Sequence, residues 1–223
     1  MILSKIDYLN LLPFYVYIKK EIPNSQLKSI INYKKSYPSK INNEFKNKKT
    51  DAAFISSIKS KNCQCTDAGI VAKDAVWSVL VLLNKEEKQD FESNTSNILA
   101  EILNIKGQVA IGDKALKIYY KNEESFIDLA QIWYEKYNLS FVFARFCFNK
   151  HSRYFKTLAK NFSNSKVKIP NYILKKESQK LGLTPKQVLD YLEQIKYKIG
   201  IKEKKSLKLF FRKIDEKKLK TIK

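Results

Sequence analysis

Four short polar clusters in this sequence carry the side chains that could bind and activate a small anionic molecule. Each comes where a predicted strand ends, and open α/β sheets bind ligands at strand ends. The candidate residues are Asn10, Ser56, Ser93, Thr95, Ser96, Gly112 and Asp113. Their amides and hydroxyls are neutral hydrogen-bond donors and acceptors, which suit binding a carboxylate and polarising a leaving hydroxyl group.

Each cluster also has a purely structural interpretation. Asn10 either caps the next helix or turns its amide toward a cleft, and Ser56 is a helix cap as readily as a ligand contact. Gly112 permits a tight turn, and Asp113 is either a ligand contact or only the cap of the following helix. The run Ser93-Asn94-Thr95-Ser96-Asn97 is more suggestive, because capping needs one hydroxyl and a helix start binds carboxylate or phosphate.

Several common chemistries lack their motifs here. There is no GxGxxG, no phosphate-loop lysine motif and no GxSxG, so nucleotide cofactors and covalent hydrolysis are not expected. Three cysteines and one histidine (Cys63, Cys65, Cys147 and His151) support neither a zinc site nor a disulfide framework. A reducing, cytoplasmic location is the expectation. The first twenty residues lack the basic start of a signal peptide, and no run approaches 18 apolar residues.

The formal charge is strongly positive, +21 over 223 residues, with 43 Lys and Arg against 22 Asp and Glu. Only three of the basic residues are Arg, whereas proteins that read bases or grip phosphates rely on the Arg fork. We therefore interpret the many lysines as a bias in the amino-acid composition of the whole chain and not as a basic patch, and we expect no nucleic-acid partner. The alternative is nucleic-acid binding through the Lys-rich C-terminal helices, with an affinity that falls steeply with salt.

The first eighty residues alternate strand-like and helix-like segments, which favours a mostly parallel sheet covered by helices. Strands are predicted at 2–6, 26–31, 52–55 and 68–72, and helices at 11–20, 38–48 and 56–62.

The strongest apolar runs are 77–83 and 141–148, and both have the length of a strand. The segment between them contains a predicted helix at 96–104, a strand at 108–111 and a helix at 126–137. So short an insert buries little core alone. We predict a first lobe of residues 1–83 and 141–223 and a small second lobe of 84–140. A cleft would lie between them, with the hinge near Leu83 and Phe141.

The tail from His151 onward is predicted to be helical. Thr184, Pro185 and Gln187 form a helix start with a capping box, and Gly200 is predicted to close that helix. The apolar stripe expected on it comprises Val188, Leu189, Leu192, Ile195 and Ile199.

Five motifs taken together resemble a known family. In order along residues 2 to 150 they are IDYLNLLPFY, DAAFISSIK, SNTSN, AIGDKAL and LAQIWYEKYNLSFVFA. They resemble the chorismate dehydratases of the futalosine route to menaquinone, which have the two-lobed fold of type II periplasmic binding proteins. The resemblance implies an α/β protein of that fold, with mostly parallel sheets flanked by helices and a helical C-terminal tail.

The same resemblance implies loss of water from chorismate to give 3-[(1-carboxyvinyl)oxy]benzoate, with no metal or organic cofactor. The family's catalytic asparagine and serine match Asn10 and, through AVWSVLV, Ser78. The hydroxyls of SNTSN match the family's substrate-binding Ser and Thr residues, and we expect them to bind a carboxylate. Asn10 and Ser78 would orient the substrate and polarise the departing hydroxyl.

Two questions stay open at the level of sequence. The general base is Asp7, Asp113 or the substrate's own enolpyruvyl carboxylate. The alternative function is that of a non-catalytic cytosolic carboxylate-binding protein of the same fold.

Overall fold

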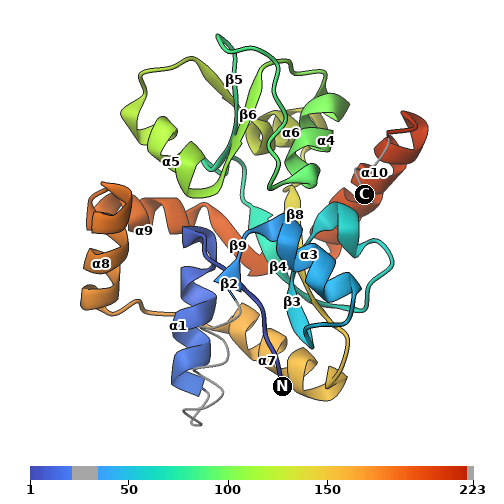
Figure 1. Cartoon of the computed structure of the whole chain (residues 1–223), viewed down its shortest axis with the longest axis vertical. Helices are drawn as coiled ribbons and strands as arrows, with labels where there is room; N and C mark the ends of the chain where they lie inside the picture. The colour runs from blue at the N-terminus through green and yellow to red at the C-terminus, as the bar shows by residue number, and fades with distance from the viewer. Residues whose placement is uncertain (22–34, 220–223) are drawn as a thin grey trace.

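The structure is a computed structural model, and it describes residues 1–21 and 35–219. The strand predicted at 26–31 lies outside these residues. Figure 1 shows two sheets, one above the other, each flanked by helices. The strands β1 (Lys5–Ile6) and β2 (Lys35–Ser36) form a parallel pair that lies beside the lower sheet. Just before β1, Leu3 forms an isolated bridge with Ala52 of the lower sheet. The strand predicted at 2–6 is therefore much shorter than expected.

In the described part of the chain, the lower sheet has four strands in the order β3, β8, β4, β9. Their bounds are β3 (Ala52–Ser56), β8 (Val142–Phe148), β4 (Cys65–Ala72) and β9 (Ile195–Lys198). The upper sheet has the order β6, β5, β7, with β5 (Val79–Leu82) between β6 (Gln108–Ile111) and β7 (Phe126–Asp128).

The expectation of mostly parallel sheets is wrong for strand pairing. Among the described residues, every strand pair in the lower and upper sheets is antiparallel, and only β1 with β2 forms a parallel ladder. The strands β3 and β4 do run in one direction, but β8 returns from the upper sheet and inserts between them. Because β8 is about ninety residues away in sequence, the local alternation of strands and helices did not reveal it.

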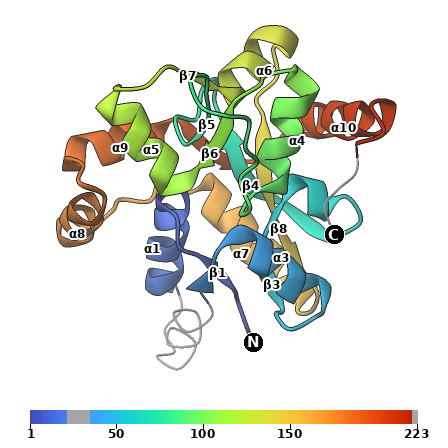
Figure 2. The same cartoon turned by 45° about the horizontal axis from the view of Figure 1, so that its top comes forward.

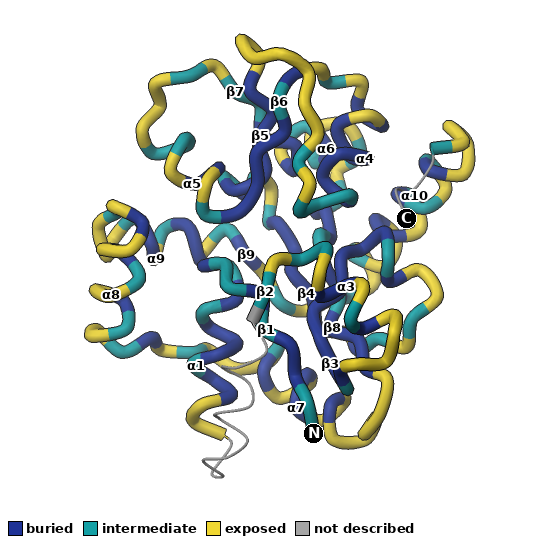
Figure 3. The backbone as a smooth tube through the Cα atoms, viewed as in Figure 1, coloured by how far each residue is buried: buried dark blue, intermediate teal, exposed yellow. Residues whose placement is uncertain are grey.

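Helices cover both sheets. Around the lower sheet lie α1 (Leu12–Glu21), α3 (Pro38–Lys46), α7 (Ser152–Asn164), α8 (Asn171–Leu181) and α9 (Pro185–Glu193), with the short 3-10 helices η1 (Leu9–Leu11) and η2 (Ser57–Ser60). The upper sheet carries α4 (Asn94–Leu103), α5 (Gly112–Lys121) and α6 (Leu129–Tyr137). Figure 3 shows buried strands with the exposed residues on the outer helix faces and loops.

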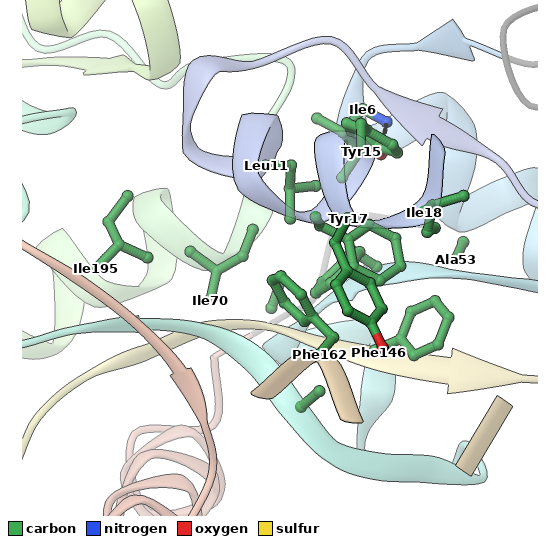
Figure 4. Packing of buried hydrophobic residues seen from close by; sticks show 14 of the residues in the cluster. Ile6, Leu11, Tyr15, Tyr17, Ile18, Ala53, Ile70, Phe146, Phe162 and Ile195 are labelled. Carbon is green, nitrogen blue, oxygen red and sulfur yellow. Dashed lines mark hydrogen bonds between the residues drawn. The ribbon is translucent and has the colours of Figure 1, made fainter. Parts of the chain in front are cut away.

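An aromatic cluster fixes α1 and α7 against the lower sheet. Phe14 of α1 lies within 5.3 Å, between ring centroids, of Phe54, Phe146 and Phe162. Phe146 and Phe162 appear in Figure 4, where the rings interleave between helix and strand. All four rings are at most 2% exposed. This packing holds the start of α1, and therefore the residues just before it, in place.

The last helix, α10 (Ile201–Glu216), packs against α4 and against β8 of the lower sheet, and it lies beside α4 in Figures 1 and 2. Its Phe210 contacts Trp133 of α6 and Phe141, and the Trp133 indole N–H donates to Ser206 Oγ at 3.0 Å. The Lys-rich tail is therefore amphipathic, with one face in the core.

Two predicted helices need correction. The helix predicted at 126–137 begins only at Leu129, because the Asp128 carboxylate accepts the N–H groups of Ala130 and Gln131, and residues 126–128 pair with β5 instead. The helix predicted to run from Thr184 to Gly200 ends at Glu193, and residues 195–198 form β9. Gly200 precedes α10, and Leu189 is 43% exposed. The capping box at Thr184 and Gln187 is confirmed.

The chain passes between the two sheets at residues 73–78 and 138–141. These segments lie together, since Ala72 N–H donates to Phe141 O and Ser140 Oγ donates to Lys73 O. Leu83, the predicted hinge, instead lies at the far end of β5, where its N–H donates to Ser125 O. The division into lobes 1–83 with 141–223 and 84–140 stays a prediction, although the pairing of β5 favours a boundary within 73–78.

The cysteines correct another expectation. Cys65 of β4 and Cys147 of β8 stand opposite each other and form a disulfide, whereas Cys63 is free. Spacing alone could not show this, because the two residues are 82 positions apart. The cytoplasmic location stays a prediction. Among the described helices, none combines the length and the apolar character needed to cross a bilayer.

Candidate functional site

A cavity of about 60 Å³ lies between the two sheets, below the start of α4 and beside η1. It is lined by Ile6, Tyr8, Asn10, Pro38, Ser56, Ile70, Val76, Ser78, Val79, Ser93, Ser96, Ile111, Gly112, Phe143 and Ala144. Six of the eight candidate site residues, Asn10, Ser56, Ser78, Ser93, Ser96 and Gly112, are among them. Thr95 and Asp113 are sequence neighbours of the lining residues Ser96 and Gly112 but do not line the cavity themselves.

Asn10 reaches the cavity from η1 and does not cap α1. The Tyr197 hydroxyl of β9 donates to the Asn10 carbonyl at 2.5 Å, which fixes the backbone of Asn10. Its side-chain Oδ1 is buried and has no hydrogen-bond partner among the described residues. Since buried polar atoms are nearly always paired, this orphaned amide points to a ligand that can bond with it.

Ser78 comes directly before β5 and is 2% exposed. Its carbonyl accepts the Gly112 N–H at 2.8 Å, and its Oγ accepts the Tyr191 hydroxyl of α9 at 2.9 Å. Burial raises the pKa of the Tyr191 phenol well above its ordinary value, so that phenol stays protonated. The serine is thus held from two sides, by α9 and by the start of α5.

The turn before Ser78 depends on Asp128. Its buried carboxylate accepts four backbone N–H groups, those of Val76 at 2.9 Å and Trp77 at 2.6 Å, and those of Ala130 and Gln131 in α6. Trp77 has a φ of 59°, a left-handed conformation that needs such support. Burial raises the pKa of Asp128, and the four hydrogen bonds oppose that rise.

The hydroxyls at the start of α4 divide between two tasks. Ser93 caps the helix by accepting the Ser96 N–H at 3.2 Å, and the two side-chain oxygens are 2.8 Å apart at the cavity wall. Thr95 turns the other way and accepts the Ile58 N–H at 3.3 Å, so it braces α4 against η2. Of the three hydroxyls predicted to bind a carboxylate, those of Ser93 and Ser96 therefore lie at the cavity and that of Thr95 does not.

Ser56 also lines the cavity, at the end of β3. It forms two hydrogen bonds with the Asn42 side chain of α3: its N–H donates to Oδ1 at 3.1 Å, and its Oγ accepts from Nδ2 at 2.8 Å. The Ser56 side chain makes no bond with η2 as a cap. Asn42 was not singled out in the sequence, and no local pattern marks it.

Gly112 has a φ of 61°, and a Cβ there would lie 2.9 Å from the nearest atom of the Tyr8 ring. Asp113 does not cap its own helix; its Oδ1 accepts the Leu9 N–H at 3.0 Å and so ties α5 to η1. Burial raises the pKa of Asp113. The other candidate base, Asp7, lines a separate cavity between α1 and α8 and is ion-paired with Lys180 at 3.6 Å.

Tyr8 is the main residue that the sequence analysis missed, although it stands in the IDYLN motif. Its ring lines the cavity and its hydroxyl donates to the Glu92 carboxylate, which precedes α4. Burial raises the pKa of Tyr8 far above its ordinary value, and the bond to Glu92 adds to that rise. The bond joins the two sheets across one wall of the cavity.

None of the described side chains that line this cavity is charged, so the groups it offers to a ligand are hydroxyls, an amide and the start of α4. Such donors can bind carboxylates and stabilise charge that develops on oxygen during a reaction. Within residues 1–21 and 35–219, no group of three His, Cys, Asp or Glu side chains gathers as a metal site would require.

Comparison with known proteins gives a consistent result. A family model described as menaquinone biosynthesis matches residues 89–216. A Campylobacter jejuni protein described as a chorismate dehydratase is 47% identical in an alignment of 215 residues, and the alignment covers 94% of this chain and 96% of that protein.

Solved structures of much lower sequence identity share the fold. A protein from Archaeoglobus fulgidus superposes with a TM-score of 0.69 at 11% identity, over 98% of this chain and 97% of its own. The periplasmic aliphatic sulphonate binding protein of Escherichia coli superposes with a TM-score of 0.52 at 12% identity, over 100% and 95%. The expected periplasmic-binding-protein-like α/β fold is confirmed.

Proposed function

The chain belongs to the chorismate dehydratase family, and on that premise we propose that it removes water from chorismate to give 3-[(1-carboxyvinyl)oxy]benzoate for menaquinone biosynthesis. The observation that carries the proposal for this chain is the common cavity of Asn10 and Ser78, into which both matched residues open together with Ser93 and Ser96. We place the reaction in the cytoplasm, where a soluble carboxylate substrate would be met.

The reaction is an elimination by a carbon–oxygen lyase. The C–H bond at the ether-bearing ring carbon breaks, and its electron pair enters the ring as the C–O bond to the neighbouring hydroxyl breaks. One proton and one hydroxide leave as water, and the ring becomes aromatic. Since aromaticity drives the overall step, the protein has only to orient the dianion, stabilise charge on the ring carboxylate and assist the departing hydroxide.

The start of α4 is the proposed carboxylate site. Ser93 and Ser96 hold their oxygens 2.8 Å apart at the cavity wall, and the positive end of the helix dipole lies behind them. Ser56, fixed by Asn42, offers a further hydroxyl from the lower sheet. The positive net charge of the chain favours the approach of a dianion, and these neutral groups then bind it.

Asn10 and Ser78 are the proposed contacts of the leaving hydroxyl. The chorismate dianion has one O–H group, and that group would donate a hydrogen bond to the unpaired Oδ1 of Asn10. The Ser78 hydroxyl would donate to the same oxygen as its bond to carbon breaks. One well-placed donor of this kind contributes roughly a hundredfold in rate.

For the base we favour the substrate's own enolpyruvyl carboxylate. Asp7 lines another cavity, and the Asp113 carboxylate is bonded to the Leu9 N–H and does not line this one. The substrate carboxylate lies beside the ring proton through the ether link, which suits an intramolecular transfer.

The experiment is incubation of the purified protein with chorismate, with the aromatic product followed by absorbance and chromatography. Wild-type protein should form the product, and N10A and S78A should each lose about a hundredfold or more in kcat. The matched control is Ser178→Ala, a serine that is also 2% exposed but lies on α8 away from the cavity. Its turnover should equal that of the wild type.

The outcome that supports the alternative function is equally clear. If chorismate binds and is recovered unchanged at every protein concentration, the chain is a carboxylate-binding protein and not a dehydratase. Undiminished turnover by N10A would remove the role given to Asn10.

A further inference from the structure

The C-terminal segment that follows the family motifs supplies a hydrogen bond to the proposed catalytic serine. Tyr191 lies on α9, 113 positions from Ser78, and its hydroxyl is 2.9 Å from Ser78 Oγ. Both residues are almost completely buried, at 1% and 2% exposure. The contact therefore joins two groups that water hardly reaches.

The direction of this bond determines where the serine proton points. Tyr191 donates and Ser78 Oγ accepts, so the Ser78 proton must be directed elsewhere. Within the described part of the chain, no acceptor for that proton is found, while Ser78 lines the cavity. The serine O–H is therefore available to a ligand in the cavity.

Two further features keep Tyr191 in the donor role. Burial raises the pKa of its phenol well above the ordinary value, which favours the protonated form that can donate. The first turn of its helix is closed by the capping box of Thr184 and Gln187, and Tyr120 holds that same turn, because its hydroxyl donates to Gln187 O at 2.8 Å. The phenol is thus held in place by its backbone as well as by its ring.

Building on the proposed function, we propose that Tyr191 is a positioning residue for dehydration, because its hydroxyl fixes the Ser78 hydroxyl with its proton toward the substrate. Donation into Ser78 Oγ also polarises the serine O–H and makes it a better donor to the departing oxygen, as in other chains of hydrogen bonds. Tyr191 itself does not line the cavity, so its effect on the substrate would pass through Ser78.

The test is Y191F, which removes one buried oxygen and keeps the ring. The expected result is a fall in kcat of about tenfold with KM changed less than about threefold, because the lost alignment matters most while the C–O bond breaks. The matched control is Y120F, which removes a hydroxyl bonded to the same helix but not to Ser78. It should keep kcat within about twofold of the wild type.

A double-mutant cycle separates positioning from general loosening of α9. If Tyr191 acts through Ser78, adding Y191F to S78A should change kcat by less than about twofold, since the acceptor is already gone. An equal loss in both backgrounds, a loss matched by Y120F, or an unchanged kcat in Y191F would each overturn the proposal. Thermal midpoints of Y191F and Y120F within a few degrees of each other exclude unfolding as the cause.

Binding distinguishes a failure of this inference from a failure of the proposed function. If the wild type forms no aromatic product, the function is wrong, and the same cycle is then read by calorimetric binding of chorismate. The positioning of Ser78 by Tyr191 is then supported if Y191F weakens chorismate binding about twofold in the wild-type background and not in S78A. Absence of that coupling, or absence of any chorismate binding, overturns it.

Discussion

Replacing Gly112 by alanine tests the close contact between Gly112 and the Tyr8 ring at the cavity wall. At this position φ is 61°, and an added Cβ would lie 2.9 to 3.0 Å from three atoms of the Tyr8 ring. That ring lines the cavity, and its hydroxyl is bonded to Glu92. The substitution therefore combines a backbone penalty with displacement of Tyr8.

A second glycine serves as a control, because it separates the backbone penalty from the displacement of Tyr8. Gly182 ends α8 with a φ of 68°, and nothing lies within 4 Å of a Cβ built there. G182A should lower the free energy of unfolding by about 1–2 kcal/mol, the cost of a left-handed alanine. G112A should cost about 1–3 kcal/mol more, the usual penalty for overpacking.

Urea unfolding followed by circular dichroism measures both variants, and chorismate turnover measures the effect on the cavity. G182A should keep wild-type turnover, while G112A should lose most of it as the Tyr8 ring is pushed from its place. In a Tyr8→Leu background, which removes the ring, G112A should cost no more than G182A. The reasoning fails if G112A and G182A destabilise the wild-type protein equally.

Three further predictions address the surroundings of the site. D128A should lower the free energy of unfolding, measured in urea, by about 3 kcal/mol, because it leaves the backbone N–H groups of Val76, Trp77, Ala130 and Gln131 without their acceptor. D128N should lower that free energy by less. A decrease below about 1 kcal/mol in D128A would contradict the bracing role of Asp128. F146A, at a ring with no exposure, should cost about 3–5 kcal/mol, whereas F91A, at a ring 78% exposed, should change the free energy of unfolding by less than about 0.5 kcal/mol. Burial raises the pKa of Asp113, so the folded state binds the proton of this carboxyl group more tightly than the unfolded state does. Protonation of Asp113 therefore stabilises the fold at low pH. This stabilisation is lost as pH rises from the ordinary Asp range to the raised pKa of the folded state. The difference in unfolding free energy between wild type and D113N should therefore fall as pH increases from about 3 to 7, and a difference that grows with pH would contradict the assignment.

Local patterns in the sequence were sufficient for several features. The capping box at Thr184 and Gln187, a helix start within residues 93–97 and the strand at residues 108–111 were predicted and are confirmed, because each is set by neighbouring residues. The family motifs also indicated Asn10 and Ser78, which the structure places around one cavity. Their chemical roles stay predictions.

The order of the strands could not be obtained in this way. A short apolar run has the same pattern whether its neighbour is parallel or antiparallel, so nothing near residue 142 indicates that β8 inserts between β3 and β4. The same is true of the pairing of Cys65 with Cys147 and of the strand β9, which resembled the end of a helix because Ile195 and Ile199 are four apart.

The sequence by itself determined the family, the capping box of α9 and most of the polar residues that open into the cavity, since these depend on residue type and short spacing. Only the tertiary structure decided what holds those residues in place. Tyr191 and Tyr197 reach Ser78 and Asn10 from more than a hundred positions away, and Asp128 joins the turn before Ser78 to α6. Hydrogen bonds of this kind depend on which segments the buried core brings together, and no local spacing encodes that proximity.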